Sequence, residues 1–363
     1  MNDLDQARGR IDEADRRMAE LFEQRMDAVR DVIAYKQAHG LPILDSGRES
    51  LILERNAGYL HNPEYAPYYE RFMRDVMSVS KAWQRAAVNG DVVAYPGAEG
   101  AFSHIAMERI FKDRKSRSYP TFQEVFAAVS GGDAACGVIP FENSYTGEVG
   151  EVLDLLLQTD VHITGVYDLR IRQNLLGLPG ARLEEIKRVY SHPQAIGQSQ
   201  EFLRRHNLEA VPYPNTALAA KHVSQCGDPA CGAIASAETA ELYGLQLLAA
   251  NINTSAENTT RFIVIERLLK PESGNRFNLL FTVSHDPGQL ANIMRIIGEM
   301  GFNLESIKSR PLHNVPWQYY FYVEIIGSLR DEKSVRLLEE LKQHCRSLKV
   351  LGTYALDAAA GEE

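Results

Sequence analysis

Apolar residues in the first 85 positions recur in alternating steps of three and four. This heptad stripe predicts one long helix that ends at Gly40-Leu41-Pro42, and two further helices are expected at 48–60 and 66–85. An apolar stripe of this length is difficult to bury within so short a region. A helical homodimer, or a larger assembly, is therefore expected. The stripe consists of Leu4, Ala7, Ile11, Ala14, Met18, Leu21, Arg25, Ala28 and Val32.

The pattern changes after Asn89-Gly90, where short apolar runs begin to alternate with helical segments. This alternation predicts an α/β domain, and its length suits two small lobes with the last strand returning to the first. Polar residues that follow these runs then lie at strand ends, where open α/β folds place ligands. The expected strands are 92–95, 136–140, 161–166, 189–191, 209–213, 232–235 and 262–266.

A third pattern follows the linker Lys270-Pro271-Glu272-Ser273-Gly274. Its elements are expected in the order β-α-β-β-α-β, which is the order of a ferredoxin-like α+β fold. The strands are expected at 278–284, 304–309, 319–325 and 349–354, and the helices at 288–300 and 333–345. The chain is thus expected to be multidomain, with an all-α domain at 1–90, an α/β domain at 91–270 and an α+β domain at 275–363.

Composition excludes several classes of protein. The formal net charge of -9 argues against a nucleic-acid partner, so anionic ligands would need locally concentrated cations. Without an apolar run of about 18 residues, no membrane span is expected. The charged N-terminus lacks a signal core, so a cytoplasmic protein is expected. The cysteines form no CxxC pair, so no metal site is expected; they are Cys136, Cys226, Cys231 and Cys345.

Several cationic and polar residues of the helical region can form a site. Arg25 occupies a stripe position that should be apolar, and a buried arginine is costly without an anion. A snorkelling side chain on a ragged heptad would explain Arg25 alone. Lys36, however, lies on the same helix face, about three turns later. Such a set can bind a small, rigid molecule with two carboxylates. The further members are Asp45, Arg48, Glu49, Ser80 and Gln84.

Together with Arg8, these positions resemble the all-helical chorismate mutase family over residues 1–88. The resemblance implies that Arg8, Arg25 and Arg48 hold the carboxylates of chorismate, assisted by Ser80. It implies that Lys36 and Gln84 address the breaking ether bond, and that Asp45 and Glu49 position the substrate hydroxyl. The pericyclic step needs only a held conformer and donors to the ether oxygen. Arg8 and Arg25 are about 25 Å apart along one helix, so Arg8 is expected from a second chain.

Four polar signatures follow apolar runs of the second region. Each alone has an ordinary structural explanation, such as a turn, a cap or strand residues. A glycine-rich strand-to-helix turn, the first of them, also suits anion binding. In chain order they are the turn from Tyr95 to His104, Pro140-Phe141-Glu142-Asn143-Ser144, Tyr190-Ser191-His192-Pro193-Gln194 with Gln198, and Asn258-Thr259-Thr260-Arg261-Phe262.

In this order the signatures resemble prephenate dehydratase across the whole region. The resemblance implies two lobes of the periplasmic-binding-protein type with prephenate in the cleft between them. It makes Thr260 the residue closest to catalysis. The leaving hydroxide needs a donor, and the sequence does not decide between Thr260 and a partly desolvated Glu142. The expected substrate-binding residues are Asn143, Ser191, His192, Gln198 and Arg261.

The third region resembles the ACT domain that senses phenylalanine. His285-Asp286-Pro287-Gly288-Gln289-Leu290 leads a helix, and Ser309-Arg310-Pro311 ends the next strand. Many relatives have alanine at position 289 and glutamate at position 308, where this chain has Gln289 and Lys308. A purely structural dimerisation domain is the alternative. The expected effector-binding residues are Gly288, Leu290, Ser309, Arg310 and Pro311.

All three regions together resemble the bifunctional chorismate mutase/prephenate dehydratase family of phenylalanine biosynthesis. An isomerase and a lyase in one chain are therefore expected, without a cofactor and with feedback regulation by L-phenylalanine. Two alternatives differ from this interpretation. In one, the helical region serves dimerisation alone; in the other, the chain is a non-catalytic sensor of small molecules.

Overall fold

The computed structural model describes residues 3–41, 46–255, 257–270, 274–313 and 315–355. Its contacts divide the chain into two compact units. One comprises Met1–Gly90 with Gly131–Ala134, and the other comprises Asp91–Ser130 with Ala135–Glu363. The boundary expected between 91–270 and 275–363 stays a prediction, because both segments fall in the second unit.

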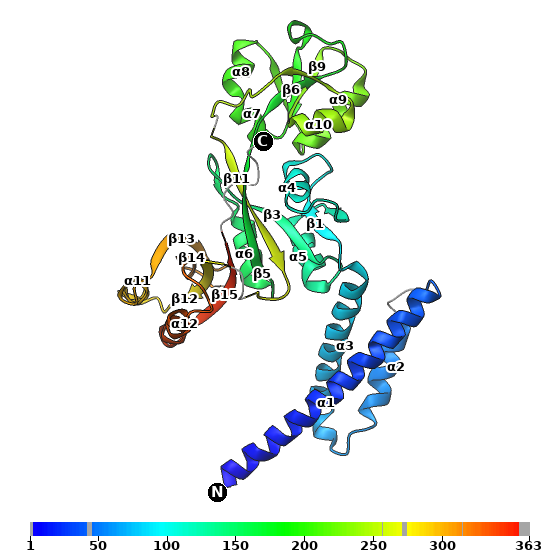
Figure 1. The fold of residues 1–363 in the computed structure, drawn as a ribbon, viewed down its shortest axis with the longest axis vertical. Coiled ribbons are helices and arrows are strands. Elements are labelled where there is room, and N and C mark those ends of the chain that lie inside the picture. The colour runs from blue at the N-terminus through cyan, green and yellow to red at the C-terminus, as the bar shows by residue number, and fades with distance from the viewer. Residues whose placement is uncertain (1–2, 42–45, 256, 271–273, 314, 356–363) are drawn as a thin grey trace. The chain divides into compact units, whose positions relative to one another are not determined.

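The first unit is helical (Figure 1). It contains α1 (Asp3–Ala38), α2 (Ser46–Ala57) and α3 (Ala66–Asn89), with a 3-10 turn at Pro63–Tyr65 before α3. Asn62 caps that turn by accepting a hydrogen bond from the Glu64 amide, which fixes where the chain reverses. Most of the apolar stripe of α1 is exposed in the single chain: Leu4 is 56%, Ile11 59% and Leu21 60% exposed.

The first lobe of the second unit is built on a mixed sheet in the order β5-β11-β3-β1-β2. The last strand, β11, returns to the first lobe, as expected. There it joins the edge of β3 opposite β1 and pairs antiparallel with β3, whereas β1 pairs in parallel with β2 and β3. The elements are β1 (Val93–Pro96), α4 (Phe102–Ile110), β2 (Ser116–Tyr119), α5 (Phe122–Gly131), β3 (Cys136–Asn143), β4 (Gly147–Glu148), α6 (Gly150–Gln158), β5 (His162–Arg170) and β11 (Thr259–Glu266).

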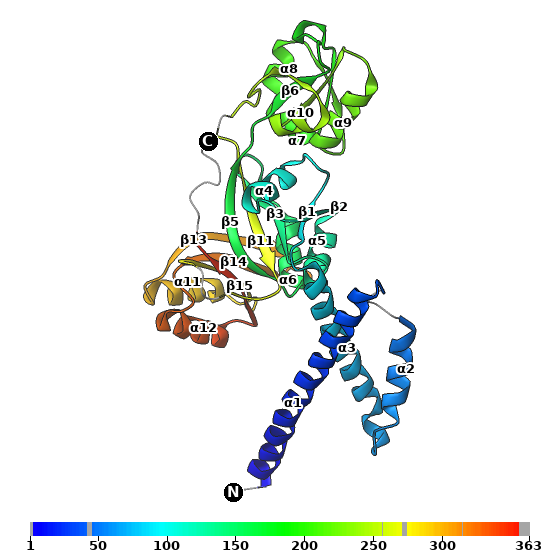
Figure 2. The ribbon, with the colours of Figure 1, turned by 45° about the vertical axis from the view of Figure 1, so that its right-hand side comes forward.

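The second lobe has its own sheet, in the order β10-β6-β9-β7-β8. The chain enters this lobe after β5 and returns before β11, so residues 171–173, 250–255 and 257–258 belong to the connections between the lobes (Figure 2). Apolar residues of the sheet pack under α9 and form much of the core of this lobe. The elements are β6 (Asn174–Gly177), β7 (Arg188–Ser191), α7 (Pro193–Gln198), α8 (Gln200–Arg205), β8 (Glu209–Pro212), α9 (Thr216–Cys226), β9 (Cys231–Ala235), α10 (Ala237–Tyr243) and β10 (Gln246–Ala249).

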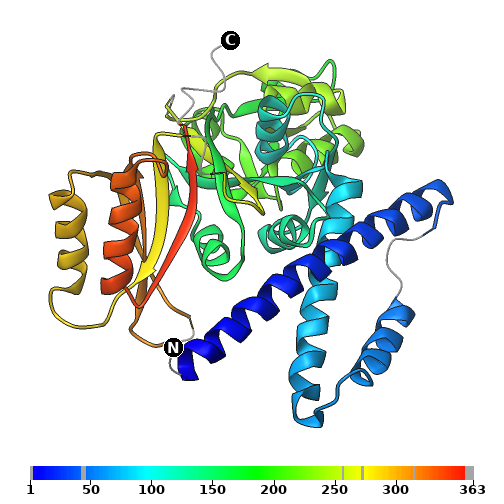
Figure 3. The same cartoon turned by 60° about the horizontal axis from the view of Figure 1, so that its bottom comes forward.

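The C-terminal region of this unit has the element order β-α-β-β-α-β. Its antiparallel sheet runs β13-β14-β12-β15, and helices α11 and α12 lie on one face of it (Figure 3). Strand β15 also pairs with β5, where Gly352 faces Ile163, so this sheet continues that of the first lobe. A Cβ on Gly352 would meet the Ile163 carbonyl oxygen at 1.8 Å, so only glycine permits the pairing. The elements are β12 (Arg276–Thr282), α11 (Gln289–Glu299), β13 (Asn303–Pro311), β14 (Tyr319–Ile326), α12 (Glu332–His344) and β15 (Ser347–Tyr354).

Candidate active sites

The helical unit brings Arg25 of α1 against Ser80 of α3. The Arg25 guanidinium donates to the Ser80 hydroxyl, which itself donates to the Val76 carbonyl at 2.8 Å. Ser80 is buried and Arg25 is half-buried. Burial lowers the pKa of Arg25. A half-buried arginine whose bonds include a neutral hydroxyl is suited to an anionic ligand.

The other residues predicted for this site are only partly located. Lys36 and Gln84 are half-buried, and Arg8 is exposed near the start of α1. Asp45 lies outside the described residues, as do the side chains of Arg48 and Glu49 in α2. The single chain therefore joins Arg25 with Ser80 and keeps Arg8 on the exposed part of the same helix.

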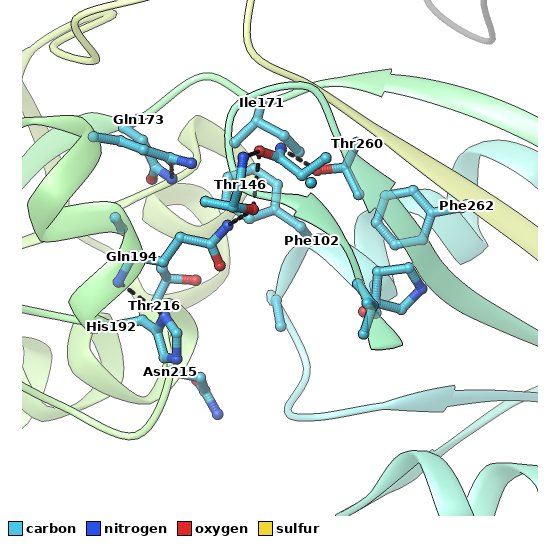
Figure 4. Close-up of a pocket in the computed structure, with 18 of the residues that line it drawn as sticks. Phe102, Thr146, Ile171, Gln173, His192, Gln194, Asn215, Thr216, Thr260 and Phe262 are labelled. Atoms are coloured by element: carbon cyan, nitrogen blue, oxygen red, sulfur yellow. Dashed lines mark hydrogen bonds between the residues drawn. The ribbon is translucent and has the colours of Figure 1, made fainter. Parts of the chain in front are cut away.

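A cavity of about 320 Å³ in the second unit is lined from both lobes (Figure 4). Four residues predicted for the substrate site line it: Asn143, His192, Gln198 and Thr260. Phe102, Phe122 and Phe262 supply apolar wall, which suits a six-membered ring. The cavity therefore combines an apolar surface with a small number of polar groups. Its further polar lining is Ser103, Thr146, Glu148, Gln173, Gln194, Asn215 and Thr216.

Hydrogen bonds fix the orientation of the Asn143 side chain. Its Oδ1 accepts from the backbone amides of Tyr145 at 2.9 Å and Thr146 at 3.0 Å. The amide nitrogen must therefore face the other way, and it donates to Thr260 Oγ1 at 2.9 Å and to Asn258 Oδ1 at 2.8 Å. Since Thr260 accepts this bond, its own hydroxyl proton remains available to a ligand in the cavity.

Helix N-termini supply positive potential to the cavity. The lining contains residues at the starts of α4 (Phe102 and Ser103), α7 (Gln194) and α9 (Asn215 and Thr216). Among the described lining residues there is no lysine or arginine. Backbone amides and neutral side-chain donors are therefore the groups that can hold carboxylates here.

His192 lines the cavity as the N-cap of α7. Its Nδ1 accepts from the Gln194 amide at 3.2 Å, and burial lowers the pKa of the imidazole. In the neutral ring the proton then stays on Nε2. His192 can therefore donate one hydrogen bond to a ligand without carrying a charge.

Two glutamines of the cavity were not among the predicted site residues. Gln194 of the second lobe donates to Thr146 Oγ1 of the first at 2.9 Å, so it joins the walls of the cavity. Gln173 is 3% exposed and donates to Gln198 Oε1 at 3.2 Å, while its own Oε1 has no partner among the described residues. That oxygen can accept from a substrate hydroxyl. Gln194 stood inside a quoted motif, whereas Gln173 lies between the lobes among the polar residues Arg172 and Asn174, so no pattern in the sequence marks it.

Three other predicted residues do not line the cavity. Ser191 donates to the Ile234 carbonyl at 2.7 Å, a structural bond that joins β7 to β9. Arg261 forms a bidentate pair with Asp168 at 3.0 and 3.3 Å. The carboxylate of Glu142 lies 2.7 Å from the Lys308 ammonium of strand β13. Thr260, and not Glu142, is thus the candidate donor that faces the cavity.

The predicted effector residues lie in two parts of the C-terminal region, the start of α11 and the end of the edge strand β13. Gly288 precedes α11 with a φ of 84°, and Leu290 packs against the core under α11. Ser309, Arg310 and Pro311 end strand β13, which pairs with the start of β14. Arg310 binds Asp154 of α6 at 2.7 and 3.0 Å, so its guanidinium is engaged by the first lobe.

No group of three potential metal ligands occurs among the described residues. In the same part of the chain, no helix is long and apolar enough to cross a membrane.

Comparison with known proteins assigns the two units. The type II chorismate mutase family model matches residues 7–85, and the prephenate dehydratase family model matches residues 93–269. A bifunctional chorismate mutase/prephenate dehydratase of Aquifex aeolicus is 31% identical over 98% of this chain and 98% of its own length.

Two solved structures resemble the second unit. One, described as GqqA, a novel type of quorum quenching acylase, is 30% identical with a TM-score of 0.68, covering 73% of this chain and 98% of its own. The other is prephenate dehydratase from Arthrobacter aurescens in complex with L-Phe. It is 27% identical with a TM-score of 0.67, covering 73% of this chain and 89% of its own.

These findings define a two-part enzyme, an isomerase followed by a lyase. The chain belongs to the bifunctional chorismate mutase/prephenate dehydratase family. It converts chorismate to prephenate and prephenate to phenylpyruvate, in phenylalanine biosynthesis. The interpretation as a bifunctional enzyme is confirmed, and the non-catalytic sensor is excluded.

Proposed function

We propose that the cavity is the prephenate site and that the Thr260 hydroxyl assists departure of the ring hydroxide. The observation that carries this is the fixed Asn143 amide, which leaves the Thr260 proton available. When the ring carboxylate leaves as carbon dioxide, its bonding electrons complete the aromatic ring. The bond between the ring carbon and the hydroxyl oxygen breaks, and the departing hydroxide takes a proton from solvent to become water. Thr260 is a weak acid, so its role is to stabilise the charge that builds on the departing oxygen.

The remaining polar groups of the cavity bind and orient the dianion in this proposal. The starts of α4 and α9 and the Nε2 proton of His192 hold carboxylates. Gln173 Oε1 accepts from the ring hydroxyl, because it is a buried acceptor with no protein partner among the described residues. Without a lysine or arginine in the described lining, the bound carboxylates are not neutralised. As carbon dioxide forms, the negative charge of that carboxylate passes to the departing ring oxygen, so a donor must face this oxygen.

The test uses one chain for both assays. Thr260→Ala should abolish conversion of prephenate and leave conversion of chorismate intact, whereas Thr260→Ser should retain much of the first activity. Lys36→Ala should abolish conversion of chorismate and leave conversion of prephenate intact, because residue 36 belongs to the other unit. If either alanine variant lost both activities while folded, the two-site proposal would be wrong.

We further propose that the mutase site is completed by a second chain. The apolar stripe of α1 is exposed over Leu4, Ile11 and Leu21, which is the face an antiparallel partner helix would cover. Such a helix would bring its own Arg8 to the region of Arg25. One antiparallel pairing of helices would thus both cover the apolar stripe and bring Arg8 to the mutase site.

We also propose that residues 275–363 form an ACT domain that binds L-phenylalanine. The β-α-β-β-α-β order and the resemblance to a prephenate dehydratase solved with L-Phe support this. Dehydratase activity of the full chain should fall as phenylalanine is added, and mutase activity should not. Activity unchanged by phenylalanine would favour a structural role for this domain. We place both activities in the cytoplasm.

A further inference from the structure

Strand alternation gives the catalytic strands two functional faces. Thr260 of β11 pairs with Asn143 of β3, and both line the cavity. The next pair in the register is Arg261 with Glu142, and neither lines the cavity. Successive side chains of a strand point to opposite faces, so Glu142 turns away from the substrate and towards the C-terminal domain. There it meets Lys308 of β13.

The short hairpin β3–β4 carries like charges directly opposite each other. Glu142 of β3 is the cross-strand partner of Glu148 of β4. Facing carboxylates destabilise a hairpin unless cations neutralise them. Strand β13 supplies both cations from alternate positions: Lys308 Nζ lies 2.7 Å from Glu142, and Arg310 Nη1 lies 3.3 Å from Glu148. The four side chains form a charge clamp, by which β13 holds the hairpin.

The cations of this charge clamp are themselves held firmly. The Lys308 side chain is only 10% exposed, and its ammonium lies 5.3 Å from the centre of the Phe141 ring. Arg310 is anchored by its bidentate pair with Asp154. A Cβ on Gly150 would lie 2.1 Å from Arg310 Nη1, so the glycine leaves the space that the guanidinium fills.

The hairpin that the charge clamp holds is also a wall of the cavity. Asn143, Thr146 and Gly147 line the cavity, Asn143 orients Thr260, and Thr146 bonds Gln194 of the second lobe. A shift of the hairpin would therefore have two effects at once. It would misplace the Thr260 hydroxyl, and it would break the contact between the two lobes at the cavity. Misplacement of a catalytic group by about 1 Å can cost about a hundredfold in rate.

We propose that Lys308 and Arg310 are positioning residues for the dehydratase reaction, acting through Glu142 and Glu148 on the wall that carries Asn143. This rests on the assignment of the cavity as the prephenate site. Lys308 is one of the two positions, with Gln289, at which the chain departs from the ACT pattern, and here it supplies one cation of the charge clamp. The C-terminal domain thereby sets the dehydratase geometry even when no effector is bound.

The experiment measures kcat and KM for prephenate, and mutase activity, in the full chain. Lys308→Met removes one cation and should lower dehydratase kcat/KM about tenfold. Lys308→Arg should restore most of it. Gly150→Ala removes no charge but displaces Arg310 from Glu148, and should lower kcat/KM in the same direction. Lys333→Met is the matched control, because Lys333 also lies near a ring, that of Phe302, but contacts no hairpin residue.

A second comparison separates positioning from simple stability. In a Glu142→Gln background the hairpin no longer carries facing charges, so Lys308→Met should then have a smaller effect on kcat/KM. If Lys308→Met and Gly150→Ala lowered only the unfolding midpoint and left kcat and KM at wild-type values, the charge clamp would be structural and the proposal wrong. Failure of Thr260→Ala to reduce activity would instead overturn the assignment of the cavity.

Discussion

At the scale of single residues, Asn143 connects the fold with the chemistry. Its oxygen closes the turn after β3, and its nitrogen holds Thr260 on β11. The turn presents backbone amides, which need an acceptor, and the Thr260 hydroxyl oxygen needs a donor. The side chain at position 143 must therefore carry both an acceptor and a donor. This explains why an amide stands here rather than a carboxylate of the same shape.

The substitution Asn143→Asp tests that polarity. A carboxylate cannot donate to Thr260, so the threonine proton would turn towards the introduced carboxylate oxygen instead of the substrate. We expect dehydratase kcat to fall about a hundredfold or more. Loss of the buried bonds should also cost about 1–3 kcal/mol of stability. Steady-state kinetics at saturating prephenate would measure the effect.

Ser144→Ala is the control for this substitution. Ser144 is the next residue and also bonds the β11 segment, through the Thr259 amide at 3.0 Å, but it does not line the cavity. It should leave kcat close to wild type. Wild-type kcat in Asn143→Asp would show that the amide does not control the Thr260 proton.

At the scale of elements, the sequence predicted most strands of the α/β domain but not the short strands β2, β4, β6 and β10, and it placed some strand ends too early or too late. The apolar runs of β3 and β11 were recognised, but both strands continue into the polar motifs, to Asn143 and back to Thr259. Residues that line a ligand site are polar, so the apolar pattern stops there. The backbone hydrogen bonds of the strand nevertheless continue through these residues. The charge clamp was not predictable either, since Lys308 and Glu142 meet only through tertiary packing.

The contact between α6 and β13 has a predictable dependence on pH. Burial opposes ionisation of Asp154, but hydrogen bonds from Arg310, Tyr320 and His313 outweigh it and lower its pKa to about 2. The folded pKa thus lies below the ordinary value of 3.8. The stabilisation is therefore present above about pH 4 and is lost as the pH falls towards 2. It amounts to about 2 kcal/mol.

Asp154→Asn should remove this stabilisation. At pH 7 the variant should lose about 2 kcal/mol of protection in β13 and α6, measured by amide hydrogen exchange. The difference from wild type should shrink below pH 4. Glu151→Gln, which changes an exposed carboxylate of the same helix, is the control. An Asp154→Asn deficit that stayed constant down to pH 2 would show that ionisation of Asp154 is not its cause.

At the scale of the whole molecule, the regions differ in how much of their apolar surface and of their proposed sites a single chain can bury and build. The cavity proposed for prephenate is lined by two lobes of one chain, and the C-terminal sheet extends the sheet of the first lobe. The helical unit instead leaves the apolar residues of α1 exposed. The heptad stripe and the separation of Arg8 from Arg25 already indicated this from the sequence.

Complementation between two inactive variants tests the shared mutase site. Arg8 and Arg25 are about 25 Å apart along α1, so one chorismate cannot contact both in a single chain. Arg8→Ala and Arg25→Ala chains should each lack mutase activity as homodimers. In a mixed dimer one site contains both substitutions and the other contains neither, so mutase activity should return to about half per heterodimer. Dehydratase activity, unchanged throughout, verifies folding. Heterodimers demonstrated by mass but without mutase activity would show that each site is built from one chain, and that the exposed stripe of α1 has another function.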